Sequence, residues 1–209
     1  MESRPPRGRQ REARRNDGKI LAAAANLLVT DRGATMADIA RAADVGVASL
    51  YRRFADKEQL IAALLVETMG RVTAVARRHS REEGPEELAV FLLEAVTAGA
   101  GSLRALAGKF PPGPEAEDQA AVMFEAITEV HRRSVAAGSL RPEVTVADFN
   151  HLFSMVHAVS GTDEGRTRAL RRRYVTLLLP GMSVSGHQPT LPGEAPTVDE
   201  VVAGWQIGR

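Results

Sequence analysis

Apolar residues recur three and four positions apart along most of the chain, in blocks of about 12 to 25 residues. This spacing places one apolar stripe along a helix. Clusters of Gly and Pro separate the blocks, and only 4% of the residues are aromatic. The pattern predicts an all-α protein with helices over about 17–31, 36–43, 47–54, 57–79, 86–107, 115–137, 146–160 and 165–179.

Several helix ends are marked by residue types that satisfy free backbone groups. Thr35 and Asp38, like Thr145 and Asp148, have the three-residue spacing of a capping box and predict helix starts. The first helix is expected to begin at Asn16 or Asp17. The Pro180-Gly181 pair is expected to end the last long helix.

Two short helices, 36–43 and 47–54, are joined by the tight turn Asp44-Val45-Gly46. This arrangement is typical of a helix-turn-helix, whose second helix enters the major groove of DNA. An ordinary helical hairpin has the same spacing, so the exposed residues decide between the two. With Leu50 and Phe54 facing inward, the second helix presents small residues beside two cations, namely Gly46, Val47, Ala48, Ser49, Arg52 and Arg53. Small side chains let the backbone approach bases, and arginines reach phosphates or guanine.

The segment 35–60 closely resembles the signature of the TetR family, including Leu50-Tyr51-x-x-Phe54 and Asp56-Lys57-Glu58-x-Leu60. The resemblance covers about residues 16–65. It implies an all-helical homodimeric repressor with a three-helix DNA-binding head and a larger body that binds a small effector. The last two body helices would form the dimer interface.

The resemblance also implies roles for individual residues. Thr35 and Lys57 would contact phosphates near helix starts, and Tyr51 a phosphate or a thymine. Gly46, Val47 and Ala48 would lie nearest the bases, with Ser49 on the same face and Arg52 and Arg53 at phosphates or guanine. Asp44 departs from the common Gly in the turn, and Val47 from a frequent polar residue, which leaves the base preference open.

The charge distribution agrees with a nucleic-acid partner at the N-terminal end. Residues 1–60 carry a net charge of +4 and the remainder −3. The six Arg of residues 1–15 could follow a DNA backbone, and a solvated start is the equal alternative. The expected domains are a flexible basic arm (1–15), the DNA-binding head (16–62), an effector-binding and dimerisation body (63–180) and a Pro- and Gly-rich tail (181–209), of which 198–205 could dock as a short helix.

Other chemistries find little support. There is no Cys, so thiol catalysis and thiolate metal sites are excluded. His151 and His157 are six residues apart and point to different helix faces, so no metal site is expected. We find no nucleophile elbow, phosphate loop or acid–base pair, and expect neither enzymatic activity nor a cofactor. No apolar run long enough for a signal peptide follows the first arginines, and a cytoplasmic location without a membrane partner is expected.

Two groups of body residues are candidates for binding. The effector pocket is expected to draw on apolar and polar residues that could also be ordinary core, namely Phe91, Glu94, Phe110, Met123, Phe124, Ile127, His131, Phe153 and His157. Glu94 lies among apolar neighbours and would need a partner if it faced inward. The dimer interface is expected to use Phe149, Leu152, Phe153, Val156, Tyr174, Leu177 and Leu178.

The sequence thus favours a ligand-responsive transcriptional regulator, a repressor by resemblance, that binds a palindromic double-stranded DNA operator as a homodimer. A largely apolar small molecule would release it. An effector-independent DNA-binding protein is the main alternative, and a helical hydrophobic-ligand-binding protein or enzyme is the other. The effector, the operator sequence and the choice between repressor and activator stay open.

Overall fold

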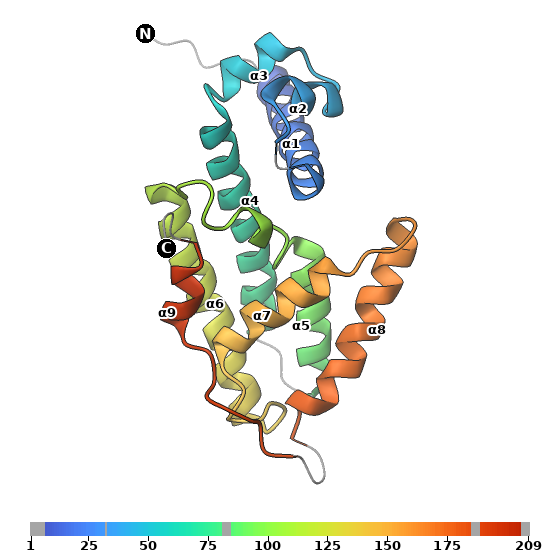
Figure 1. Ribbon diagram of the computed structural model, residues 1–209, viewed down its shortest axis with the longest axis vertical. Coiled ribbons are helices and arrows are strands. Elements are labelled where there is room, and N and C mark those ends of the chain that lie inside the picture. The colour runs from blue at the N-terminus through green and yellow to red at the C-terminus, as the bar shows by residue number, and fades with distance from the viewer. Residues whose placement is uncertain (1–6, 32, 81–84, 185–188, 206–209) are drawn as a thin grey trace. The chain divides into compact units, whose positions relative to one another are not determined.

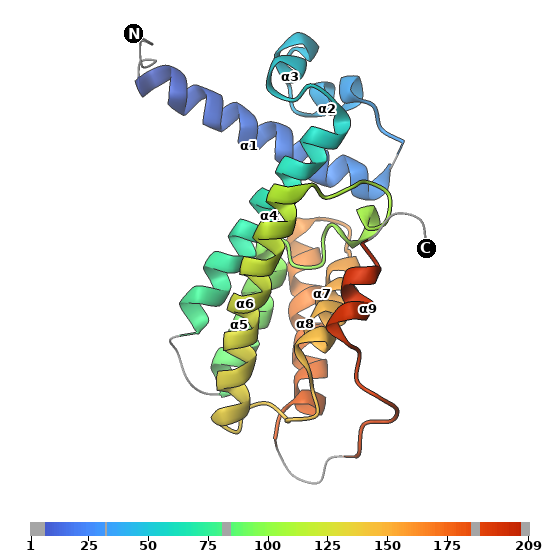
Figure 2. The same cartoon turned by 90° about the vertical axis from the view of Figure 1, so that its left-hand side faces the viewer.

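The computed structural model describes residues 7–31, 33–80, 85–184 and 189–205, and these contain helices without any strand. The all-α prediction is therefore confirmed (Figures 1 and 2). The elements are α1 (Arg7–Thr30), α2 (Met36–Ala42), α3 (Val47–Arg53), α4 (Lys57–His79), α5 (Pro85–Ala98), the short 3₁₀ helix η1 (Arg104–Leu106), α6 (Pro114–Ala136), α7 (Val146–Ala158), α8 (Glu164–Met182) and α9 (Val198–Ala203).

The chain divides into two compact units between Leu64 and Leu65. In the first unit α1 packs on α2, and α2 packs on α3. Ile20, Leu28, Ile39, Leu50 and Leu60 are all buried there, each on the apolar stripe of its own helix. These contacts give the small N-terminal unit its own hydrophobic core.

Helix α1 is longer than the sequence pattern indicates. It begins at Arg7, so residues 7–15 are helical, and the expectation of a flexible arm is wrong for them. Residues 9–15 are Arg, Gln, Glu and Ala, which are strong helix formers, and they carry the helix back beyond Asn16 and Asp17. The rest of the expected arm, residues 1–6, lies outside the described residues.

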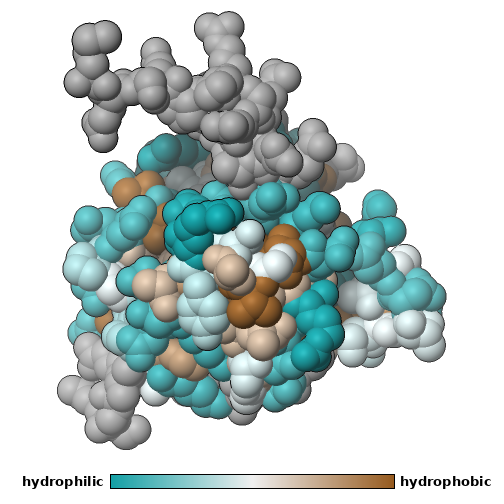
Figure 3. Space-filling view, turned by 90° about the horizontal axis from the view of Figure 1, so that it is seen from above, coloured by the Kyte–Doolittle hydropathy of each residue, from teal (hydrophilic) through white to brown (hydrophobic). Residues whose placement is uncertain are grey.

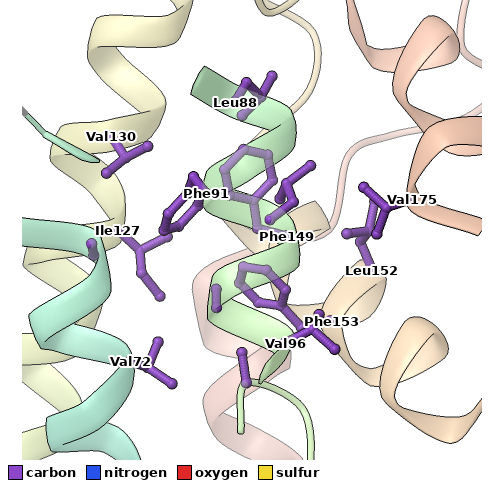
Figure 4. Close-up of a cluster of buried hydrophobic side chains, with 14 of the residues drawn as sticks. Val72, Leu88, Phe91, Val96, Ile127, Val130, Phe149, Leu152, Phe153 and Val175 are labelled. Atoms are coloured by element: carbon purple, nitrogen blue, oxygen red, sulfur yellow. The ribbon is translucent and has the colours of Figure 1, made fainter. Parts of the chain in front are cut away.

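The second unit is organised around an aromatic cluster. Helix α5 packs against α7 and α8, and α7 also contacts α6, α8 and α9. Phe91 of α5 and Phe149 and Phe153 of α7 are buried together, with ring centroids 6.1 to 6.3 Å apart (Figure 4). Such tilted and edge-on pairs add to the stability gained from apolar burial.

Helix α5 ends at Ala98 instead of near residue 107. Gly99 has φ 112°, and the Ala100 amide donates to the Ala95 carbonyl at 2.8 Å, which closes the helix end. Gly101 lies so close to α7 that a Cβ atom would overlap the Phe153 carbonyl. The Gly99 to Gly101 segment is therefore the end of the helix, and the helical residues in the rest of the expected span are those of η1.

The C-terminal region is more ordered than expected. Helix α8 continues through Pro180 to Met182, so Pro180-Gly181 does not end it. A proline this near the end costs few backbone hydrogen bonds. Further on, Thr197 and Glu200 form a capping box that starts α9, which confirms the short helix expected within 198–205. Figure 2 shows α9 beside α7. The expectation of a loosely held tail is thus wrong for residues 189–205.

By length and composition α4 could cross a membrane, and it is the one such helix among the described residues. Its apolar residues Leu64, Val72 and Ala76 are buried in the protein. Core helices of water-soluble proteins have the same character, so this feature is weak evidence for a membrane span.

Candidate nucleic-acid interface

Thr35 begins the first helix of the candidate site. The Asp38 amide donates to Thr35 Oγ1 at 3.2 Å, and the Thr35 amide donates to Asp38 Oδ2 at 3.0 Å. The capping box expected here is confirmed. Hydrogen bonds from the Thr35 hydroxyl and amide lower the pKa of Asp38 below its usual value. The start of α2 is therefore held by a charged cap.

The turn between α2 and α3 closes on a left-handed residue. Asp44 has φ 54°, its amide donates to the Arg41 carbonyl at 3.2 Å, and the Val45 amide donates to the Ala40 carbonyl at 3.0 Å. These two bonds form a Schellman motif, in which Gly is the usual residue and Asp is tolerated. The short turn sets the angle at which α3 leaves α2.

Helix α3 is anchored on one side and exposed on the other. Leu50 and Phe54 are buried, as the sequence pattern predicts. Val47 is 43% exposed, and the other residues expected to face outward are exposed as well, namely Gly46, Ala48, Ser49, Tyr51, Arg52 and Arg53. Figure 3 views the molecule from above its orientation in Figure 1 and shows hydrophobic residues within a largely hydrophilic face. Helix α3 therefore has the solvent-exposed face that the sequence predicts.

The two arginines of α3 differ in how they are held. Arg53 Nε lies 3.0 Å from both carboxylate oxygens of Asp17 on α1, and its guanidinium is 5.1 Å from the centroid of the Phe54 ring. Arg52 makes only a long contact, 3.4 Å, with Ser49 Oγ. Arg53 is thus fixed toward α1, whereas Arg52 extends from the exposed face. The sequence indicated Asp17 only as a possible helix start and not as a partner of Arg53, because a contact across 36 residues leaves no local signal.

Lys57 and Thr35, both expected to contact phosphate, also form hydrogen bonds within the protein. Lys57 Nζ donates to the Ala34 carbonyl at 2.7 Å and is half-buried. The Thr35 hydroxyl donates to Asp38 Oδ2 at 2.6 Å. Both residues lie at the N-terminal ends of helices, where positive partial charge favours a phosphate. Lys57 also ties the loop before α2 to the start of α4.

The residues expected to form an effector pocket are divided between the core, the surface and one hollow. Phe91, Ile127 and Phe153 are buried in the core, and Met123 packs against it. Glu94 does not face inward: its half-exposed carboxylate pairs with Arg78 and lies 2.8 Å from His79 Nε2, and these hydrogen bonds, that of His79 first, lower its pKa. Phe110 is half-buried in the loop before α6, and His157 is half-buried on α7. Phe124 and His131 do line a shared hollow between α6 and α7.

The expected dimer surface is also divided. Phe149, Leu152, Phe153 and Val156 are buried within their own chain, because α7 uses its apolar stripe to pack on α5 and α8. They are therefore not available to a partner. Tyr174, Leu177 and Leu178 of α8 are exposed, as is Met155 on α7. The apolar surface open to a partner lies mainly on α8.

Metal chemistry finds no support in the described part of the chain. No group of three or more His, Cys, Asp or Glu side chains there is placed to hold an ion. The site that remains consists of a capped helix, a tight turn and an exposed second helix with small residues and cations. A helix-turn-helix DNA-binding domain has this construction.

Comparison with known proteins gives a family match for the N-terminal domain and structural neighbours for most of the chain. Residues 20–64 match the bacterial regulatory proteins of the tetR family. A TetR transcription regulatory protein from Mycobacterium vanbaalenii is similar in structure, with TM-score 0.58 and 27% identity over 84% of this chain and 99% of that one. A TetR transcriptional regulator from Streptomyces coelicolor has TM-score 0.58 and 24% identity over 81% of this chain and 99% of that one. LfrR from Mycobacterium smegmatis, solved in complex with proflavine, has TM-score 0.61 and 22% identity over 84% and 99%. No curated protein matches the sequence. Residues 20–64 therefore match a TetR-family DNA-binding domain, and the fold of the chain is similar to that of TetR-family transcriptional regulators.

Proposed function

We propose that this protein is a cytoplasmic repressor that binds a palindromic DNA operator as a homodimer and is released by a small-molecule effector. The observation that supports the proposal most strongly is the state of α3. The residues of α3 that we propose to face the DNA bases are exposed, whereas Leu50 and Phe54 on the opposite side of the helix are buried in the core. A helix anchored in this way can enter a major groove without losing its place in the fold.

The small residues at the start of α3 determine how closely it approaches DNA. Gly46, Val47 and Ala48 allow the backbone to come near base edges, and the Val47 side chain suits contact with a thymine methyl group. The Ser49 hydroxyl can donate to or accept from a base or phosphate. Arg52, with only its long contact to Ser49, is the cation placed to reach phosphate or guanine.

A homodimer follows from the size of the recognition surface. One small head buries too little DNA for useful affinity, so two heads must bind together. Tyr174, Leu177 and Leu178 supply an exposed apolar surface on α8 that a second copy would cover. Two symmetric heads with recognition helices about 34–36 Å apart would read a palindromic operator.

Effector control is supported by a neighbour and by physical linkage. LfrR, a fold neighbour, was solved in complex with the small molecule proflavine. A ligand that prefers one conformation of the body weakens operator binding by its differential binding free energy, typically ~1–3 kcal/mol. The same ligand must then bind less tightly to the operator complex.

Selection from a random duplex library tests the proposal without knowledge of the operator. We expect enrichment of a two-fold-symmetric sequence that binds at least about 1,000-fold more tightly than scrambled DNA. Affinity for both duplexes should fall with salt, because contacts with phosphate release counterions. Equal affinity for all duplexes would instead indicate an effector-independent, sequence-independent DNA-binding protein, and would contradict the operator proposal.

A further inference from the structure

The C-terminal strap, residues 189–205, contacts the rest of the second unit at three places. Arg141 is buried, and its guanidinium donates to the Pro189 carbonyl at 3.1 Å and to the Gly181 carbonyl at 3.3 Å. Thr145 Oγ1, whose hydrogen is donated to Asp148 Oδ2 at 2.9 Å, lies 3.5 Å from the Pro196 carbonyl oxygen. At its far end Gly204 lies so close to the Arg104 guanidinium that a Cβ atom would come within 2.7 Å. The strap is thus held against the body.

The strap forms one wall of a hollow of about 390 Å³. A hollow of this volume is in the range that holds small molecules. The other walls come from α6, from the loop before α7 and from the first turn of α7. Its lining residues are Phe124, Thr128, His131, Pro142, Val144, Thr145, Val146, Ala147, Pro196, Thr197 and Val198.

The chemistry of the walls restricts what can bind. The described residues that line the hollow include no Asp, Glu, Lys or Arg. A charged ligand group would lose hydration there without gaining a counter-charge, which is unfavourable. The hollow therefore suits an uncharged and largely apolar molecule.

His131 is one of the polar residues that line the hollow. Its Nε2 lies 2.6 Å from the Val144 carbonyl, and a carbonyl oxygen can only accept, so Nε2 carries the hydrogen. In the neutral ring Nδ1 is then an acceptor. An edge-on contact with Phe149, at 5.7 Å between ring centroids, also holds the imidazole in place. A ligand hydroxyl or N–H is the complementary group.

We infer that this hollow is the effector site and that it takes an uncharged, largely apolar molecule with one hydrogen-bond donor, enclosed on one side by the C-terminal strap. The assignment as an effector site rests on the proposed effector control. Phe91, Phe149 and Phe153, by contrast, pack against one another between α5 and α7.

The test uses 2-naphthol, an uncharged aromatic with a hydroxyl donor, and the full chain at pH 7 in calorimetric titrations without DNA. The inference predicts a dissociation constant below about 1 mM. 2-Methoxynaphthalene, which lacks the donor, should bind about fivefold more weakly, and 2-naphthoate more weakly still. Absence of 2-naphthol binding, or equal binding of all three compounds, would overturn the inference.

Two matched variants on α9 locate the site. Val198, 41% exposed, lines the hollow, whereas Val202, 50% exposed and one turn further along, is not among its lining residues. Val198→Trp should weaken 2-naphthol binding at least about tenfold by filling the space, and Val202→Trp should leave it within about twofold. Equal effects of the two variants would place the binding elsewhere and overturn the assignment.

His131→Phe tests the acceptor directly. It keeps an aromatic ring but removes Nδ1, so the advantage of 2-naphthol over its methoxy analogue should fall from about fivefold to about one. An unchanged ratio in a folded variant would contradict the role of His131. Because these titrations contain no DNA, their failure leaves operator binding untouched, and failure of the library selection leaves the ligand result untouched.

Discussion

Asp44 shows how one residue shapes the recognition unit. Its left-handed backbone allows the Arg41 and Ala40 carbonyls to be satisfied at the end of α2, so that α3 can start within a few residues. An L-residue without a short polar side chain pays about 1–2 kcal/mol in this conformation. The turn is therefore sensitive to the residue type at position 44.

Asp44→Ala should lower the free energy of unfolding by about 1 kcal/mol, because Ala adopts positive φ less readily than Asp. Asp44→Asn is the matched control, since Asn also tolerates this conformation, and it should stay within about 0.5 kcal/mol of the native protein. Urea denaturation followed by circular dichroism measures both. Equal stability of the Ala and Asn variants would contradict the strain argument.

His157 makes stability depend on pH. Burial, and secondarily the charge of Arg171, lowers the pKa of His157 to about 4. The unfolded chain binds a proton near pH 6.5, so it takes up protons in a range where the folded protein does not. The contribution of His157 is therefore favourable above about pH 6.5 and is lost as the pH falls toward about 4.

His157→Gln should remove this contribution. Between pH 7 and pH 5 the native protein should lose about 1 kcal/mol more unfolding free energy than the variant, a figure reduced for the partial exposure of the ring. Urea denaturation at the two pH values gives the comparison. If the difference in unfolding free energy between the native protein and the variant were the same at both pH values, the lowered pKa of His157 would be contradicted.

Interactions between residues close together in the sequence could be predicted from it, whereas interactions between residues far apart in the sequence could not. The capping boxes of Thr35 and Thr145 were predictable because both partners lie within one helical turn. The Arg53 to Asp17 pair and the Arg141 contacts join positions tens of residues apart. No periodicity or spacing records such pairs, because only the folded chain brings them together.

At the scale of elements, the amphipathic stripes predicted the helices, but other forces set several boundaries. Strong helix formers extend α1 back to Arg7, and the positive φ of Gly99 ends α5 early. The apolar stripe of α7 was equally suited to a partner chain or to its own core. The apolar residues of α7 pack on α5 and α8 and therefore belong to the core of their own chain. The apolar stripe alone does not distinguish between these two arrangements.

The C-terminal strap is the element that the sequence analysis assigned least accurately. Arg141→Met should lower the unfolding free energy by about 2 kcal/mol, because the carbonyls of Gly181 and Pro189 lose a charged donor. The variant should also be cut faster at Glu194 by a Glu-specific protease, as intact mass spectrometry would record.

The exposed Arg172 of α8 provides the control for this experiment. Arg172→Met removes a similar charge from the surface and should change stability by less than about 0.5 kcal/mol. If Arg141→Met behaved like Arg172→Met in stability and in cleavage rate, the strap would not depend on Arg141.

At the scale of the whole molecule, the proposed dimer depends on α8. Leu177 is 59% exposed at the centre of the apolar surface. Leu177→Glu should raise the dimer dissociation constant at least about tenfold, since a charge would be buried without a partner at the interface. Sedimentation equilibrium measures the effect, with the exposed Val202→Glu as a control that should leave the dimer intact. A native protein that is monomeric at micromolar concentration would contradict the proposed dimer.

The fold class and the recognition helix were predictable because their residues are contiguous, from Thr35 to Leu60. The hollow in the second unit was not, because its walls come from α6, α7 and the strap, which are far apart in sequence. Phe124 and His131 were recognised as candidates by residue type alone. Residue type could not separate them from Phe91 and Phe153, which the fold places in the core.

The exposed face of α3 is proposed to read DNA sequence, and Ala48 is the residue that tests this role most directly. Fluorescence anisotropy with the selected duplex and a scrambled duplex compares Ala48→Leu with Arg52→Ala. Ala48→Leu should weaken binding to the selected duplex at least about tenfold and leave the scrambled one within about twofold, because the added bulk separates the helix from base edges. Arg52→Ala, which removes a phosphate-reaching cation, should weaken both duplexes and reduce the salt slope by about 1. Equal losses on the two duplexes for Ala48→Leu would contradict the account.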